Sequence, residues 1–267
     1  MDLELRDRHA LVVGASRGIG LEVWRQLAAE GAHVTVAGHR RETLEAAAAE
    51  HGLTPAGYLV FDIASEASID DAIAQLDEAG TPVEIVVLSV ARPGFDSIWS
   101  FDVTEWELNM RTKYIGPGHF SRQLVRQMAA RGNGGAIVML SGIASTGAMG
   151  DTLATGGANS AIDNFVKLLA SAAGPYGVRV LAVSPGTTVT PRFEQWASDE
   201  TVAAMSEIVP LRRLGSAAEL ASVVTFLASP RGGYVNGTTV VVDGGLTTAA
   251  RYRAVAPEPE PAAAVQP

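Results

Sequence analysis

The chain has 267 residues, of which 47% are hydrophobic, so it is long enough to bury one sizeable core. Its net charge of −9 argues against nucleic acid or an anionic membrane as a partner, because both attract basic surfaces. The chain has no cysteine and therefore forms no disulfide or thiolate metal site, and we expect no metal ion. Because it also lacks a membrane-length apolar run and a signal-peptide pattern at its N-terminus, we expect a cytoplasmic protein.

A strand, a glycine turn and a helix are predicted at the beginning of the chain. Residues 10–13 form an apolar run typical of a buried strand, and Ile19, Val23 and Leu27 repeat at helical spacing. The turn between them contains Gly14, Ser16, Arg17, Gly18, Ile19 and Gly20. Such glycines let a pyrophosphate approach the backbone, and the helix N-terminus attracts it. The pattern predicts a dinucleotide site, and the alternative is a turn that binds nothing.

A second strand is predicted at residues 31–37, and it indicates which dinucleotide is bound. Enzymes that select NAD usually place a carboxylate at the end of this strand, where Gly38 stands here. His39, Arg40 and Arg41 follow and, with Arg17, form a cationic pocket suited to a 2′-phosphate. NADP is therefore favoured over NAD. The alternative is that Arg40 and Arg41 are the solvated first turn of the next helix.

Strands and helices alternate along the rest of the chain. Further strands are predicted at residues 58–61, 83–88, 136–140, 178–183 and 238–242, and helices at 42–50, 69–76, 158–169 and 217–227, with a mostly helical stretch at 95–130. This order predicts a single-domain α/β protein with a Rossmann-type, doubly wound parallel sheet over residues 1–250. Residues 251–267 are rich in Pro, Ala and Glu and are expected to be disordered.

The sequence resembles the short-chain dehydrogenase/reductase family over about residues 7–246. The resemblance rests on three stretches, namely the loop 14–20, Ser184-Pro185-Gly186-Thr187-Thr188-Val189-Thr190, and the run from Arg213 to Gly245. It implies that Asp62 and Ile63 lie near the adenine and that Pro185, Gly186 and Thr188 contact the cofactor. It also implies a homodimer or homotetramer built through the helices that begin near Glu105 and Thr155 and through the last strand.

The residues that carry out catalysis in this family differ in this chain. Members usually have Tyr-x-x-x-Lys, a serine ahead of the tyrosine and an asparagine on the preceding long helix. The corresponding positions hold Thr155, Asn159 and Gly142, and the position of Trp106 places Lys113 at the asparagine, although Asn109 lies one turn earlier. A threonine hydroxyl cannot replace the tyrosine, whose pKa of ~10 is far lower. We therefore expect the usual carbonyl–alcohol chemistry to be lost or very slow.

Lysine and asparagine have exchanged places, and this points to a rewired site. The candidate catalytic residues are Lys113, as an acid, base or oxyanion partner, and Thr155 and Asn159 as hydrogen-bonding groups. The alternative is that Lys113 reaches solvent and pairs with a surface acid. His119 and Asp151 are weaker candidates.

Two functions follow from this sequence. The first is an NADP(H)-binding enzyme that performs an atypical hydride transfer or a redox-neutral cyclisation, dehydration or isomerisation on a small organic substrate. The second is a catalytically inactive cofactor-binding partner or regulatory subunit. Residues 187–212, with Arg192, Phe193, Trp196 and Met205, are expected to form a flap over the substrate. The flap's aromatic content indicates an apolar substrate, although a flap packed on its own core would look the same.

Overall fold

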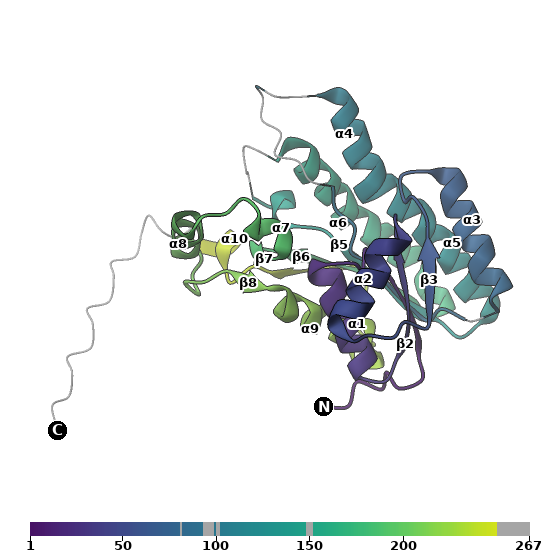
Figure 1. The fold of residues 1–267 in the computed structure, drawn as a ribbon. Helices are drawn as coiled ribbons and strands as arrows, with labels where there is room; N and C mark the ends of the chain where they lie inside the picture. The colour runs from purple at the N-terminus through teal and green to yellow at the C-terminus, as the bar shows by residue number, and fades with distance from the viewer. Residues whose placement is uncertain (81, 93–98, 100–101, 148–151, 250–267) are drawn as a thin grey trace.

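A computed structural model describes residues 1–80, 82–92, 99, 102–147 and 152–249 (Figure 1). Asp151 and the tail 251–267 lie outside these residues. The described chain forms a seven-stranded sheet in the order β3-β2-β1-β4-β5-β6-β9, and every neighbouring pair is parallel. The predicted single-domain, doubly wound α/β fold is therefore confirmed.

The first half of the chain alternates regularly between strands and helices. Its elements are β1 (His9–Val13), α1 (Gly18–Ala29), β2 (His33–Gly38), α2 (Arg41–His51), β3 (Gly57–Val60), α3 (Glu66–Glu78) and β4 (Ile85–Leu88). Helix α3 begins three residues before the predicted range because Ser65 caps it, accepting the N–H of Ser68. The apolar repeat marked only the buried part of that helix.

The second half adds three strands to the sheet and a separate segment beside it. Its sheet and covering helices are α4 (Val103–Met110), α5 (Gly116–Arg131), β5 (Gly135–Leu140), α6 (Leu153–Ala173), β6 (Val178–Pro185), α9 (Ala217–Ala228) and β9 (Thr239–Val242). The segment comprises β7 (Thr188–Val189), α7 (Pro191–Glu194), α8 (Asp199–Ile208), β8 (Gly215–Ser216) and α10 (Leu246–Ala249). Strand β6 extends to Pro185, two residues past the prediction, because its pairing with β9 continues as far as Pro185 and Val242.

The sheet is buried on both faces. Alternate residues of β1 show this, since Ala10 and Val12 pack with α1, α2 and α9, while Leu11 and Val13 pack with α3, α5 and α6. Trp24 is among the largest fully buried side chains of the first cluster, and Phe120 of the second. This double burial explains why the strands appear in the sequence as continuous apolar runs.

The long helical stretch is interrupted by a turn of π-helix. The turn, η1 (Arg111–Ile115), lies between α4 and α5 and contains Lys113. Immediately after it, a Cβ at Gly116 would overlap the carbonyl oxygen of Ile63, so only glycine lets the helix pass this close to the loop after β3. Such π-turns occur frequently at functional sites.

The segment containing α7 and α8 packs around its own small core. Phe193, Val209 and Leu214 are buried there, with Val202 and Met205 packed against them. The rings of Phe193 and Trp196 meet edge to face with their centroids 5.0 Å apart. These side chains therefore cover one another, and their apolar character carries no information about a substrate. Among the described residues, no helix is long and apolar enough to cross a membrane.

Candidate functional site

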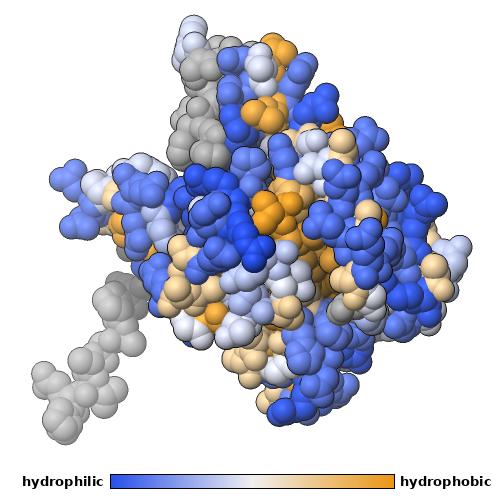
Figure 2. All heavy atoms as spheres, turned by 45° about the vertical axis from the view of Figure 1, so that its right-hand side comes forward, coloured by the Kyte–Doolittle hydropathy of each residue, from blue (hydrophilic) through white to orange (hydrophobic). Residues whose placement is uncertain are grey.

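A cavity of about 630 Å³ lies at the carboxyl ends of β1, β2 and β4, where the strand order reverses direction. In open α/β sheets this switch point is where ligands bind. The lining residues are Val13, Gly14, Ser16, Arg17, Gly18, Ile19, Gly38, His39, Asp62, Ile63, Ala64, Ser89, Val90, Ala91, Arg92, Leu108, Thr112, Thr190, Pro191 and Arg192. The space-filling view shows apolar side chains near the middle of a largely hydrophilic face (Figure 2).

The glycine loop after β1 is shaped by close backbone contacts. Gly14 has φ +84°, and a Cβ there would overlap the carbonyl oxygen of Ser89. A Cβ at Gly20 would overlap the carbonyl oxygen of Gly14, and Gly18 has φ +59°. These positions require glycine because the loop must turn tightly between β1, β4 and α1.

The N-terminus of α1 is available to an anion. The helix begins at Gly18, its N-cap Arg17 makes no side-chain capping bond, and its first turn has no acidic residue. The free N–H groups of such a turn and the helix dipole favour a negatively charged ligand. The cradle thus fits the pyrophosphate of a dinucleotide.

The predicted cationic pocket is smaller than the sequence indicates. Arg17 and His39 line the cavity, whereas Arg40 is not among the lining residues. The Arg41 guanidinium is held by Glu45 at 2.8 Å and lies 4.8 Å from the centre of the Tyr58 ring. Arg41 is therefore engaged in its own helix and with β3 and does not line the cavity, which agrees with the alternative that it belongs to the first turn of α2 (Arg41–His51). Gly38 ends β2, so no carboxylate stands there.

Asp62 and Ile63, which the resemblance places near the adenine, line the cavity, but the proline–glycine loop does not. Pro185, Gly186 and Thr188 lie at the end of β6 and just beyond it, and the Thr188 hydroxyl donates to the Gly186 carbonyl at 2.9 Å. The residues that reach the cavity from this side are Thr190, Pro191 and Arg192, slightly later in the chain.

Lys113 is buried, with only 5% of its surface exposed. Its ammonium group donates to the carbonyl oxygen of Ser141 at 3.3 Å. Burial lowers its pKa to about 8, and the nearby Arg192 also lowers it, while Asp163 acts in the opposite direction. The alternative that this side chain reaches solvent and pairs with a surface acid is wrong.

Thr155 and Asn159 lie in the same polar cluster as Lys113. The Asn109 amide donates to the Thr155 hydroxyl at 3.3 Å, so Asn109 is part of the cluster too. Asn159 is buried, and the Ser141 hydroxyl donates to its backbone carbonyl at 3.3 Å. The side-chain oxygens of Asn109 and Asn159 have no hydrogen-bond partner among the described residues. Lys113, Thr155 and Asn159 are not among the residues that line the cavity, but Thr112, which precedes Lys113 in the chain, does line it.

Gly142 and Asn159 depend on each other sterically. The backbone at Gly142 is extended, with φ 167°, so any residue could adopt it. A Cβ there, however, would lie only 2.8 Å from the Asn159 amide nitrogen. The amide therefore occupies the space that a side chain at position 142 would need.

Thr112 and Ser89 line the cavity and were not among the predicted site residues. Arg192, expected only as one residue of a flap over the substrate, also lines it, whereas the next residue, Phe193, is buried in the segment's own core.

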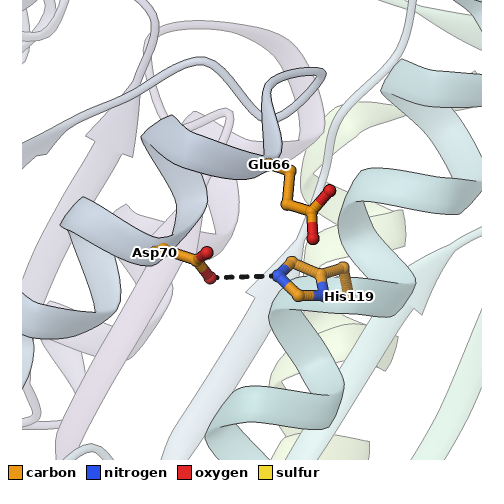
Figure 3. Close-up of side chains that lie close together, drawn as sticks. All are labelled: Glu66, Asp70 and His119. Carbon is orange, nitrogen blue, oxygen red and sulfur yellow. Dashed lines mark hydrogen bonds and ion pairs between the residues drawn. The ribbon is translucent and has the colours of Figure 1, made fainter.

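A second group of titratable side chains lies outside the cavity, where α3 faces α5 (Figure 3). The potential ligand atoms of Glu66, Asp70 and His119 all lie within 4.8 Å of one another. The His119 ring nitrogen is 3.1 Å from an Asp70 oxygen, and this hydrogen bond lowers the pKa of Asp70. Both carboxylates are exposed, and the pair links two helices. His119 thus has a structural contact and no position at the cavity.

The sheet order, the glycine cradle and the cavity at the switch point define a dinucleotide-binding α/β protein. Comparison with known proteins specifies which class it is. Residues 14–247 match the family model described as "Enoyl-(Acyl carrier protein) reductase". The chain belongs to the short-chain dehydrogenase/reductase family of oxidoreductases.

Relatives of known activity align along nearly the whole chain. A galactitol 2-dehydrogenase (L-tagatose-forming) of Cereibacter sphaeroides is 33% identical, covering 89% of this chain and 94% of its own. A 3-oxoacyl-(acyl-carrier-protein) reductase of Haemophilus influenzae is 31% identical, covering 91% and 99%. A gluconate 5-dehydrogenase of Burkholderia cenocepacia, solved in complex with NADP and tartrate, superposes with a TM-score of 0.85 at 27% identity, covering 92% and 98%.

Proposed function

We propose that this protein is an NADP(H)-binding enzyme whose active site is built on Lys113 in place of the family's tyrosine and lysine. The observation that carries the proposal is the buried Lys113 ammonium, held against the Ser141 carbonyl in a π-turn beside the cavity. A buried charge is costly and is rarely kept without a purpose. Asn109, one turn earlier on the same helical run, donates its amide to Thr155, the threonine at the position of the family's tyrosine.

The cofactor proposal rests on the chain's own cradle. The loop from Gly14 to Gly20 and the uncapped start of α1 suit a pyrophosphate, and Arg17 with His39 suits a 2′-phosphate. The relative solved with NADP supports the same preference. When bound, NADP(H) supplies or accepts a hydride. We expect NADPH to bind more tightly than NADH, because Gly38 provides no carboxylate for a ribose hydroxyl.

The proton chemistry is assigned to Lys113. With a pKa of about 8, this amine exists in both protonation states near neutral pH and can give or take a proton. The Thr155 hydroxyl cannot do so, but it can donate a hydrogen bond to a substrate while the Asn109 amide holds its oxygen. The Asn159 side-chain oxygen, buried and without a partner in the described chain, remains as an acceptor. The reaction is then an atypical hydride transfer or a redox-neutral cyclisation, dehydration or isomerisation of a small organic molecule.

The test compares the chain's two lysines. We expect Lys113→Met to lower kcat by about 10²–10⁴ on a substrate found by incubating the enzyme with NADPH and a panel of carbonyl, imine and enoyl compounds. Exposed Lys167 provides the matched control, and Lys167→Met should leave kcat unchanged. NADPH affinity, measured by fluorescence titration, should be the same in both variants.

Two outcomes would contradict the proposal. Equal turnover in wild type and Lys113→Met would remove Lys113 from catalysis. Tight NADPH binding without turnover on any compound would support the alternative, a catalytically inactive cofactor-binding partner or regulatory subunit. An inactive subunit would also tolerate loss of the glycine cradle, which is intact here.

A dimer or tetramer is part of the same proposal. Val103 and Trp106 of α4 and Leu153 and Leu168 of α6 are exposed apolar side chains on the helices that the family resemblance assigns to subunit contacts. Analytical ultracentrifugation should then give a species larger than the monomer, and a monomer at all concentrations would refute this part.

A further inference from the structure

We propose that Arg192 binds an oxyanion group of the substrate, a carboxylate or a phosphate, at the end of the cavity nearest Lys113. This inference rests on the proposed function, because it assigns a substrate class to the same cavity. Arg192 lies on α7, in the segment between β6 and α9 that reaches over the cavity.

The local structure directs Arg192 toward the cavity. Thr190 begins α7, and its hydroxyl oxygen accepts the N–H of Phe193 at 3.3 Å. Phe193 is buried in the core that the segment shares with Val209 and Leu214, which anchors the helix from the other side. The neighbouring Arg192 lines the cavity and is only partly exposed.

Among the described residues, the charges around the cavity leave this guanidinium without a counter-ion. Two of the three guanidinium nitrogens of Arg92 donate to Glu105, the shorter contact being 2.7 Å. The Asp62 carboxylate accepts the N–H of Ala64. Within the described chain, neither Arg17 nor Arg192 forms an ion pair. In a protein with net charge −9, two unpaired guanidinium groups facing one cavity indicate anionic ligands.

The two arginines reach the cavity from different segments of the chain, and their charges lie close enough to interact. Arg17 belongs to the loop after β1, and the next residue, Gly18, faces Thr190 at the start of the segment that carries Arg192. Arg192 comes from the chain after β6, on the other side of the switch point, together with Leu108 and Thr112 of the helices near Lys113. Burial and the nearby Arg17 lower the pKa of Arg192, and Arg192 in turn lowers that of Lys113. An oxyanion between Arg192 and Lys113 would relieve this repulsion.

A guanidinium is well matched to such a group. Its parallel N–H donors bind the two oxygens of a carboxylate or phosphate in a fork, which an ammonium group cannot do. The oxyanion would hold the reacting part of the substrate beside Lys113 and Thr155. Arg192 is then a specificity-determining residue that distinguishes acids and phosphate esters from neutral alcohols and ketones.

The experiment measures anion binding to the NADPH-loaded protein, so it requires no knowledge of the reaction. Succinate and glycerol phosphate are titrated at constant ionic strength while NADPH fluorescence is followed, with butanediol and glycerol as their neutral counterparts. We expect one of the anions to bind saturably and the neutral compounds not to bind. Binding of succinate would indicate a carboxylate substrate, and binding of glycerol phosphate would indicate a phosphate substrate.

Arg192→Met should weaken that binding by about tenfold or more, and Arg192→Lys should restore it only in part. NADPH affinity should change by less than about threefold in both variants. Arg25→Met removes the same charge from an exposed ion pair with Glu22 on α1 and should bind the anion like wild type. Thermal melting checks that the variants are folded.

Each contrary result has a distinct meaning. Equal anion binding in wild type and Arg192→Met, or no binding of either anion, would overturn the inference. If Arg192→Met lost as much NADPH affinity as an Arg17 variant, Arg192 would be shown to hold the cofactor, and the inference would be overturned as well. Failure of wild type to bind NADPH at all would instead contradict the proposed function.

Discussion

Replacing Lys113 by methionine tests whether this lysine is buried as a destabilising charge. Its pKa falls from 10.5 in the unfolded chain to about 8 in the folded protein, which corresponds to about 3 kcal/mol. Between these two values the unfolded chain binds more protons than the folded one, so stability rises with pH across this window. Below about pH 8 both states are protonated and the full cost is present.

The prediction concerns the difference between wild type and Lys113→Met. Methionine fills a similar volume without a charge, but it leaves the Ser141 carbonyl without its donor, a cost that does not vary with pH. Relative to the variant, wild type should therefore gain about 2–3 kcal/mol in free energy of unfolding between pH 7 and pH 10.

Urea denaturation followed by circular dichroism at several pH values measures this quantity. Lys167→Met, which changes the exposed lysine, should follow wild type at every pH. A difference between wild type and Lys113→Met that stays constant from pH 7 to 10 would refute the reasoning, because it would mean that the Lys113 ammonium is solvated. The same residue predicts a pH dependence of activity: if neutral Lys113 accepts a proton, kcat/KM rises through about pH 8.

The glycine cradle and the cofactor preference give two further predictions. Gly14→Ala should abolish NADPH binding and destabilise the protein by about 1–3 kcal/mol more than Gly52→Ala does. Both glycines have a positive φ, but only the Cβ of an alanine at position 14 would overlap a backbone atom. Urea denaturation and NADPH titration measure the two effects, and equal losses in both variants would contradict the close contact with Ser89. Arg17→Glu should reduce NADPH affinity at least tenfold while changing NADH affinity much less, since a carboxylate repels the 2′-phosphate. Equal losses for the two dinucleotides in fluorescence titrations would count against a phosphate contact at Arg17.

Local patterns in the sequence were sufficient for the sheet and for the dinucleotide cradle. The apolar runs of a doubly buried parallel sheet are continuous, and they locate the strands directly. The loop from Gly14 to Gly20 is also local, because its spacing, its strand and its helix all lie within one short stretch. The family's motifs and the position of Trp106 also predicted that Lys113, Thr155 and Asn159 correspond to the family's catalytic positions.

The sequence alone determined the doubly wound α/β fold and the glycine loop after β1, and it predicted that the family's catalytic residues are replaced. The tertiary structure decided which side chains are buried, which contact one another and which line the cavity. Lys113 is buried and donates to the Ser141 carbonyl, and the Arg41 guanidinium contacts Glu45 and the Tyr58 ring. Phe193 packs into the core of its own segment, whereas its neighbour Arg192 lines the cavity. Periodicity and spacing report a residue's position along one element, whereas burial, charge and pKa depend on elements distant in the chain that pack against it.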